Sequence, residues 1–291
     1  MVLDMTKYHE EFKDILKRKI TNNKDTVPIL HIITDGKDER CKVYMKSKLN
    51  MCKELGINCV IDTVTTKEEM FNLCENIWSK YEVSICQLPI SKELEEVYRN
   101  QAEGIDVDGM FSGQSLFDKD YSICPATSKG IYRYLKTTYT NLRGKNIVLV
   151  GMGDLCNKPL LVMLANEGAT IMTFNTSTDE TVRLNMLKNA DIVVCAGGKK
   201  GTVKTSQLSD TKKVLVFNVG IVFDENGKLD TELEIDIEKD NIDYTPRIKG
   251  VGVSTVLSLM DNIYNKGVSD KFNKDKLYYQ KIITGDNHDT E

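Results

Sequence analysis

The segment CKVYMKSKLN places Tyr44 four residues before Lys48, so on a helix the two side chains share one face. A phenol and an ammonium group that converge on one ligand can hold it and transfer a proton. A lysine removed from water beside an aromatic ring has its pKa lowered towards neutrality, which suits proton transfer. The alternative is an ordinary exposed lysine, and spacing alone favours it because Lys42, Lys46 and Lys53 stand nearby.

Two further segments carry polar groups that suit ligand binding. Gln87 precedes Leu88-Pro89 at the end of a predicted strand, where its amide can reach a ligand or Lys48. In the segment DVDG, a carboxylate of Asp106 or Asp108 can accept two hydrogen bonds from an aminopyrimidine-type edge. Taken alone, the first segment is better explained as a simple strand end, and the second is also typical of a common turn.

A glycine turn follows the apolar run over residues 147–150. Gly151-Met152-Gly153 ends that run, and a helical pattern begins beyond Pro159. In a strand, glycine turn and helix of this kind, the backbone can approach a phosphate closely, and the first helical amides favour its negative charge. Glycine also ends strands for purely steric reasons, so this turn by itself leaves both interpretations open.

The elements that must position these residues alternate along the chain. Helical spacing predicts helices over residues 8–20, 44–55, 67–79, 92–100, 127–139, 181–187 and 254–264, with a short one near 206. Apolar runs predict strands over residues 26–33, 59–64, 83–88, 147–150, 170–174, 192–195 and 214–219. Residues 106–116 are predicted to form a loop, and the charged tail from about residue 270 is predicted to be poorly ordered.

This alternation predicts the α/β class, with parallel sheets covered by helices on both faces. We expect two α/β domains flanking a cleft, the second a Rossmann-like dinucleotide-binding domain. The first would comprise residues 1–124 plus 252–291, and the second residues 125–251. Active sites in such sheets lie at the carboxyl ends of the strands.

Composition narrows the class of function. The formal net charge of −4 gives no reason to expect binding to nucleic acid or to an anionic membrane. No apolar run approaches the roughly 20 residues that span a bilayer, and the acids in the first residues do not suit a targeting peptide. Eight cysteines without a CxxC pair make a metal site improbable, so we expect reduced thiols in a cytoplasmic protein.

Five motifs in the same order resemble those of the bifunctional methylenetetrahydrofolate dehydrogenase/methenyltetrahydrofolate cyclohydrolase family. The resemblance covers residues 5–267, and a coincidence of five ordered motifs is much rarer than any one of them. They are YxxxK at Tyr44–Lys48, QLP at Gln87–Pro89, DVDG at Asp106–Gly109, GxGxxxxKP at Gly151–Pro159 and TPxxxGVGxxT at Thr245–Thr255.

The resemblance implies two reactions and a role for each matching residue. Methylenetetrahydrofolate would be oxidised by hydride transfer to NAD(P), and the methenyl product hydrolysed to 10-formyltetrahydrofolate. Tyr44 would stack on the folate, Lys48 would activate water or pass a proton, Gln87 would tune Lys48, and Asp108 would hold the pterin. The resemblance further implies substrate contacts at Gly250 and Gly252, and cofactor contacts at Gly151, Met152, Gly153, Asn175, Thr176, Gly197 and Gly220.

Departures from the family pattern concern the cofactor. Where the family usually has GRSxxVGxP, this chain has GMGDLCNKP, so Met152 replaces an arginine associated with the 2′-phosphate of NADP. The acid expected for a ribose 2′-hydroxyl is also missing, since Phe174-Asn175-Thr176 stands there. NADP and NAD both remain possible acceptors, with a slight preference for NAD.

Three alternatives stay open at this level. The chain could be a dehydrogenase with weak cyclohydrolase activity, a non-catalytic nucleotide-sensing protein, or an unrelated NAD-dependent dehydrogenase that shares only the glycine-turn domain. The last leaves Tyr44, Lys48, Gln87 and Asp108 unexplained. By resemblance alone we also expect a homodimer.

Overall fold

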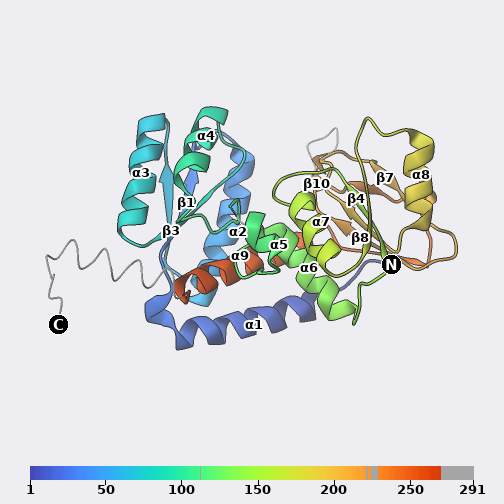
Figure 1. Ribbon diagram of the computed structural model, residues 1–291, viewed down its shortest axis with the longest axis horizontal. Coiled ribbons are helices and arrows are strands. Elements are labelled where there is room, and N and C mark those ends of the chain that lie inside the picture. Colours follow the sequence, from blue (N-terminus) through green and yellow to red (C-terminus); the bar gives the residue numbers. More distant parts are fainter. Residues whose placement is uncertain (112, 221, 224–228, 270–291) are drawn as a thin grey trace, which may run out of the picture. The chain divides into compact units, whose positions relative to one another are not determined.

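The computed structural model describes residues 1–111, 113–220, 222–223 and 229–269. These residues form two compact units, which we call unit 1 and unit 2. Unit 1 comprises Met1–Phe12 and Ser112–Ser258, and unit 2 comprises Lys13–Phe111 and the chain from Leu259 onward. Two of the three boundaries fall inside helices, α1 (Thr6–Asn22) and α9 (Val251–Gly267), so each of these helices contributes to both units (Figure 1). The tail from residue 270 lies outside the described residues.

Unit 2 is built on a three-stranded parallel sheet in the order β2-β1-β3. Its strands are β1 (Leu30–Thr34), β2 (Cys59–Thr63) and β3 (Val83–Cys86), and its helices include α2 (Glu39–Leu55), α3 (Lys67–Ser79), α4 (Lys92–Gln101) and the 3₁₀ turn η1 (Lys24–Thr26). Helix α2 ends before Gly56, whose φ of +78° favours glycine, and α3 begins with a capping box between Thr66 and Glu69. These end signals fix the lengths of the helices that connect the parallel strands.

Unit 1 is built on a five-stranded parallel sheet in the order β12-β8-β6-β4-β5. Its strands are β4 (Asn146–Val150), β5 (Thr170–Phe174), β6 (Ile192–Cys195), β8 (Val214–Asn218) and β12 (Ile242–Tyr244). Its helices include α5 (Gly113–Phe117), α6 (Ala126–Thr138), α7 (Asn157–Asn166), α8 (Glu180–Asn189) and the 3₁₀ turn η2 (Thr205–Gln207). Two short pairs complete the described part, β7 (Val203–Lys204) with β11 (Leu233–Glu234) and β9 (Val222–Phe223) with β10 (Leu229–Asp230).

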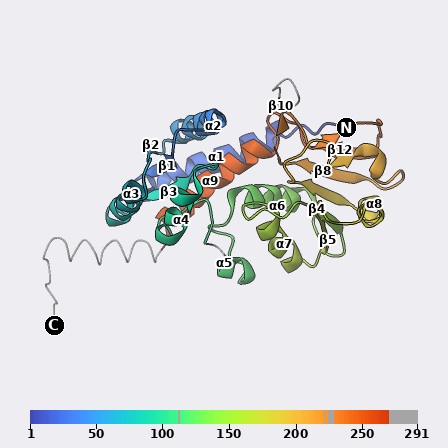
Figure 2. The same cartoon turned by 90° about the horizontal axis from the view of Figure 1, so that it is seen from above.

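The apolar run over residues 147–150 of β4 follows from burial on both faces. Ile147 and Leu149 pack in one core with residues of α6 and α7, whereas Val148 and Val150 pack in a second core that includes Leu187 of α8. Helices α6 and α7 therefore cover one face of the sheet and α8 the other (Figures 1 and 2). A sheet covered on both sides has no polar face, which removes the alternation typical of half-exposed strands.

The predicted α/β class is confirmed, and three elements, α3, β5 and β6, match the sequence prediction at both ends. Three predictions need correction. The strand predicted over 26–33 begins only at Leu30, because Thr26 closes a turn on Asn23 and Pro28 has no amide hydrogen to donate. The strand predicted over 83–88 ends at Cys86, and the loop predicted over 106–116 contains the start of α5.

Candidate active site

Lys48 and Gln87 meet in unit 2 through a direct hydrogen bond. The Nζ of Lys48, on α2, donates to Oε1 of Gln87 over 2.9 Å, and Gln87 directly follows β3. The amide nitrogen of Gln87 donates to the carbonyl of Leu88 over 2.9 Å, which leaves its oxygen to face the lysine. The buried Gln87 is thus held in one orientation by its own chain.

The two acids of the DVDG segment have different surroundings. The buried carboxylate of Asp106 accepts hydrogen bonds from the hydroxyl of Tyr98 and from the backbone amides of Asp108, Gly109 and Met110, at 2.8 to 3.3 Å. Asp108 is half-buried, and its carboxylate interacts electrostatically with Lys48. Asp106 therefore shapes the turn, whereas the Asp108 carboxylate lies near enough to Lys48 to attract its charge. We call Lys48, Gln87 and Asp108 the lysine cluster.

Burial moves the charges of this cluster toward neutral forms. Removal from water lowers the pKa of Lys48, and the Asp108 carboxylate opposes that shift. Burial also raises the pKa of Asp108, with Lys48 acting in the opposite direction. Burial raises the pKa of Asp106 to about 7, and the neighbouring charge of Asp108 adds to the increase. The pKa of Lys48 and the pKa of Asp108 are therefore closer together than those of exposed side chains of the same types.

Three thiols interact electrostatically with Lys48. Cys41 and Cys52 are on α2 itself, seven residues before and four after the lysine, so helical spacing accounts for both. Cys86 ends β3, and only the fold brings it to the lysine. Burial raises the pKa of Cys86 to about 12, so this thiol stays protonated and behaves as a small apolar group. Tyr44 lies one helical turn before Lys48 and is 39% exposed.

The two glycines of the turn in unit 1 have different surroundings. Gly151 has a φ of +76°, and a Cβ there would lie 2.7 Å from the carbonyl oxygen of Ala196. A Cβ at Gly153 would meet nothing within 4 Å, so this residue leaves open space in front of the turn. Helix α7 begins four residues later, and its dipole favours an anion near its start. The amide of Lys158 already donates to the Gly153 carbonyl, and Pro159 has no amide hydrogen.

Asn157 holds the glycine turn in place. Its buried Nδ2 donates to the carbonyls of Val150 and Gly151 over 3.0 and 2.7 Å. The asparagine that departs from the usual glycine of the family pattern therefore fixes the turn to the start of α7. No sequence signal distinguished this role from that of an ordinary helix-start residue.

A buried glutamate anchors the neighbouring loop after β6. The carboxylate of Glu232 accepts hydrogen bonds from the amides of Gly197 and Gly198 over 2.8 and 2.7 Å. Burial raises the pKa of Glu232, and the two amides oppose that shift. A Cβ at Gly220 would collide with the same carboxylate, so Gly220 makes room for it. Sequence reasoning found Gly197 and Gly220 but missed the glutamate between them.

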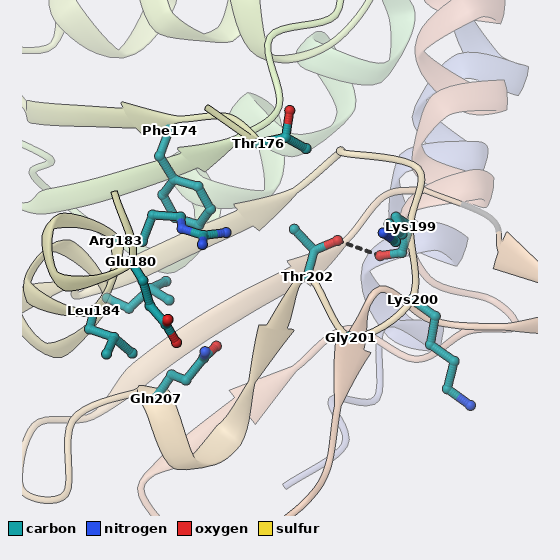
Figure 3. Close-up of a pocket in the computed structure, with 11 residues that line it drawn as sticks. Phe174, Thr176, Glu180, Arg183, Leu184, Lys199, Lys200, Gly201, Thr202 and Gln207 are labelled. Atoms are coloured by element: carbon teal, nitrogen blue, oxygen red, sulfur yellow. Dashed lines mark hydrogen bonds between the residues drawn. The ribbon is translucent and has the colours of Figure 1, made fainter. Parts of the chain in front are cut away.

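Asn175 and Thr176 lie directly after the carboxyl end of β5, next to the glycine turn that follows the parallel strand β4. The side-chain oxygen of Asn175 accepts a hydrogen bond from the amide of Ser177 over 2.9 Å, so it caps its own turn. Thr176 borders a hollow of about 250 Å³ between α8 and the loop after β6 (Figure 3). This hollow lies beside the strand end where dinucleotide-binding domains of this type place the adenosine ribose.

Gly250 directly precedes α9 in unit 1, and Gly252 is the second residue of that helix. A Cβ at Gly250 would lie 2.0 Å from the carbonyl oxygen of Pro246, so only glycine fits there, whereas Gly252 has open space. The structure therefore explains Gly250 by the packing of its own loop. Among the described residues, no group of three histidine, cysteine or acidic side chains could hold a metal ion. No helix in the described ranges is long and apolar enough to cross a membrane.

Unit 1 is a parallel α/β unit with a glycine turn of the kind that binds phosphate, and unit 2 contains the lysine cluster. Together these features define a dinucleotide-dependent enzyme with a second substrate. The chain belongs to the tetrahydrofolate dehydrogenase/cyclohydrolase family. The family's catalytic domain matches residues 3–108, and its NAD(P)-binding domain matches residues 125–270. Membership through both domains excludes an unrelated dehydrogenase that shares only the glycine turn.

Similar proteins agree with this assignment over nearly the whole chain. The bifunctional protein FolD of Mycoplasma mycoides subsp. mycoides SC is 30% identical over 280 residues, covering 91% of this chain and 95% of the relative. FolD of Caldicellulosiruptor saccharolyticus is 33% identical over 247 residues, covering 80% and 87%. The crystal structure of FolD from Campylobacter jejuni has the same fold, with a TM-score of 0.82 at 24% identity over 92% of this chain and 98% of that one.

The protein is thus an enzyme of folate one-carbon metabolism. It has methylenetetrahydrofolate dehydrogenase and methenyltetrahydrofolate cyclohydrolase activities, and it uses NAD(P). The nucleotide-sensing alternative without catalysis is excluded.

Proposed function

We propose that the lysine cluster of unit 2 is the folate site and that Lys48 carries the cyclohydrolase step. The observation that supports this most strongly is the 2.9 Å hydrogen bond from Lys48 to Gln87, with the carboxylate of Asp108 beside it. These groups come from α2, from the end of β3 and from the turn after α4, and nothing in their local sequences requires them to meet.

Each member of the site has a separate role in this proposal. Asp108 accepts hydrogen bonds from the amino group and ring nitrogen of the pterin, because its own chain leaves its carboxylate available. Tyr44 stacks on the folate with its exposed ring face. Lys48, with its pKa lowered by burial, takes a proton from the water that adds to the methenyl carbon. Gln87 holds the amine in position.

The residues of unit 1 fit a dinucleotide. Gly151 and Gly153 admit the pyrophosphate, and the dipole of α7 favours its negative charge. Gly197 and Gly220 shape the neighbouring loop, and Asn175 and Thr176 border the ribose position. When bound, the nicotinamide accepts a hydride from the methylene carbon, so the protein contributes mainly binding and orientation to this half of the reaction. Gly250 and Gly252 are proposed to contact the folate.

The acceptor is NAD or NADP, and Met152 bears on the choice. Met152 offers no positive charge to a 2′-phosphate, which favours NAD if no other cation takes over that contact. Initial rates with the two dinucleotides at equal concentration measure the preference directly. A strong preference for NADP would contradict the inference from Met152.

Three further properties are proposed from the resemblance. The folate-binding domain would comprise residues 1–124 plus 252–291 and the NAD(P)-binding domain residues 125–251. The enzyme would be a cytoplasmic homodimer. Light scattering on the purified chain, whose monomer mass is 32.9 kDa, tests the dimer by the doubled mass, and a monomer at micromolar concentration would contradict it.

The Lys48→Met variant tests the proposed site. We expect it to lose hydrolysis of directly supplied methenyltetrahydrofolate, followed by the absorbance of the methenyl band, while folate still binds. The control is Lys46→Met, which removes an exposed lysine from the same helix and should leave hydrolysis unchanged. Full hydrolysis by Lys48→Met would refute the role of Lys48, and weak hydrolysis by the unaltered chain would favour a predominantly dehydrogenase enzyme.

A further inference from the structure

The hollow at the carboxyl ends of β5 and β6 lies in unit 1 and has a volume of about 250 Å³. Phe174 forms one wall, α8 a second, and the loop containing Lys199 and Thr202 a third (Figure 3). The hydroxyl of Thr202 donates to the backbone carbonyl of Lys199, which closes that loop into a turn. The hollow therefore has walls of regular structure and a fixed loop.

Arg183 brings an unpaired positive charge to this hollow. Its side chain extends from α8 past the ring of Phe174 (Figure 3). Its Nε is buried and has no hydrogen-bond partner among the described residues. A buried guanidinium donor without a partner costs free energy, and an anionic ligand in the hollow would satisfy it.

The other charges of the hollow leave an excess of positive charge. Lys200 is paired with Asp230 at 2.5 Å, and its ammonium points away from the other lining residues (Figure 3). Lys199 has no ion pair within the described part of the chain. Glu180 is the acid on the wall, and its carboxylate points toward Gln207 (Figure 3). The two positive charges of Arg183 and Lys199 thus exceed the single negative charge of Glu180, whose carboxylate points toward Gln207.

The position of the hollow indicates which anion it takes. In a doubly wound sheet the glycine turn holds the pyrophosphate, and the ribose of the adenosine lies at the end of the adjacent strand, here β5. An acid at that point would accept the 2′-hydroxyl of NAD, but Phe174, Asn175 and Thr176 stand there. An arginine near the same point suits a 2′-phosphate instead.

We propose that Arg183, assisted by Lys199, binds the 2′-phosphate of NADP and makes this chain selective for NADP. The contact replaces the arginine that the family usually carries where this chain has Met152. The proposal rests on the proposed function of unit 1. It replaces the preference for NAD, which was inferred from the glycine turn and the residues directly after β5 alone.

Binding of two adenosine fragments to the full chain tests this proposal without turnover. We expect 2′,5′-ADP to bind about tenfold more tightly than 5′-AMP in calorimetry at low salt, because one charge-assisted contact has about that effect. Arg183→Gln should abolish most of the difference, Arg183→Lys should restore part of it, and Lys199→Gln should reduce it less. The control is Lys188→Gln, an exposed lysine of α8 that pairs with Asp210 outside the hollow.

The outcomes separate this proposal from the proposed function. Equal binding of the two fragments, or equal weakening of both by Arg183→Gln in a folded variant, would overturn the 2′-phosphate contact. Rapid oxidation of methylenetetrahydrofolate with NAD and NADP at equal kcat/KM would overturn the selectivity while the dehydrogenase function stands. Selective binding of 2′,5′-ADP together with full hydrolysis by Lys48→Met would support the contact and refute the proposed role of Lys48.

Discussion

Asp106 and Asp108 show how two identical side chains, two residues apart, acquire different tasks. The carboxylate of Asp106 accepts three backbone amides and the Tyr98 hydroxyl, whereas Asp108 interacts with Lys48. The sequence DVDG indicates a turn with two acids but not their division of roles, because that depends on the residues of α4 and α2 that pack around the turn. The ligand role of Asp108 stays a prediction.

Asp106 should make stability depend on pH. Its pKa of about 7 in the folded state exceeds the ordinary 3.8, so the folded protein binds a proton that the unfolded chain releases. The stabilisation is therefore complete below about pH 4 and is lost as pH rises through about 7. We expect the unfolding free energy of the native chain to fall relative to that of Asp106→Asn over this range. Denaturant titrations at several pH values measure the difference, and one independent of pH would contradict the assignment.

Gln87 should set the pH at which Lys48 becomes an effective base. Replacing the amide by a carboxylate in Gln87→Glu would stabilise the ammonium form of Lys48 and raise its pKa. The rise of the hydrolysis rate with pH should consequently move to higher pH, after subtraction of the uncatalysed rate. Gln101→Glu, at the end of α4, serves as the charge-matched control. A profile that stays in place or moves to lower pH would argue against the contact between the two side chains during catalysis.

Helices and strands could be predicted from the sequence where local signals agree on where they begin and end. They were harder to predict where a strand forms only because it pairs with another strand. Helix α3 has a capping box at Thr66 and an amphipathic pattern, so both of its ends could be predicted. Strand β12 is three residues long with Asp243 in its middle, and its existence depends on pairing with β8. The same limit applies to the Glu232 anchor of the loop after β6, which joins residues 35 positions apart.

The glycine turn between β4 and α7 contains two glycines with different physical requirements. Gly151→Ala places a Cβ 2.7 Å from the Ala196 carbonyl at a φ of +76°, so we expect a loss of about 1–3 kcal/mol in unfolding free energy. Gly153→Ala meets nothing within 4 Å and should unfold like the native chain. Chemical denaturation of the two variants compares them directly. Equal destabilisation would mean that the close approach to Ala196 is not what requires glycine at 151.

At the scale of the whole molecule, the residues proposed for the two reactions belong to different compact units. The lysine cluster lies in unit 2, while the glycine turn and the 2′-phosphate hollow lie in unit 1. Sequence order alone predicted this separation only in outline, because each unit combines two distant segments of the chain.

This separation predicts that the two activities can be removed independently. Gly153→Val adds bulk to the open space in front of the turn, so it should abolish dinucleotide-dependent oxidation. Hydrolysis of directly supplied methenyltetrahydrofolate should persist, since Lys48, Gln87 and Asp108 are untouched. The two rates are measured on one preparation with an intact unfolding transition. Parallel loss of both would show that the cofactor turn also supports hydrolysis.

The division of α9 between the units has a consequence for synthesis on the ribosome. Its later part supplies interior contacts to unit 2, where Asn262 donates to the Val107 carbonyl over 2.9 Å and Met260 accepts from the Cys52 thiol. Unit 2 therefore cannot complete its interior when its first hundred residues emerge, and must wait until about 150 more have been translated. A nascent chain stalled before α9 should expose apolar surface and recruit chaperones, even though most of its β-sheets have already been made.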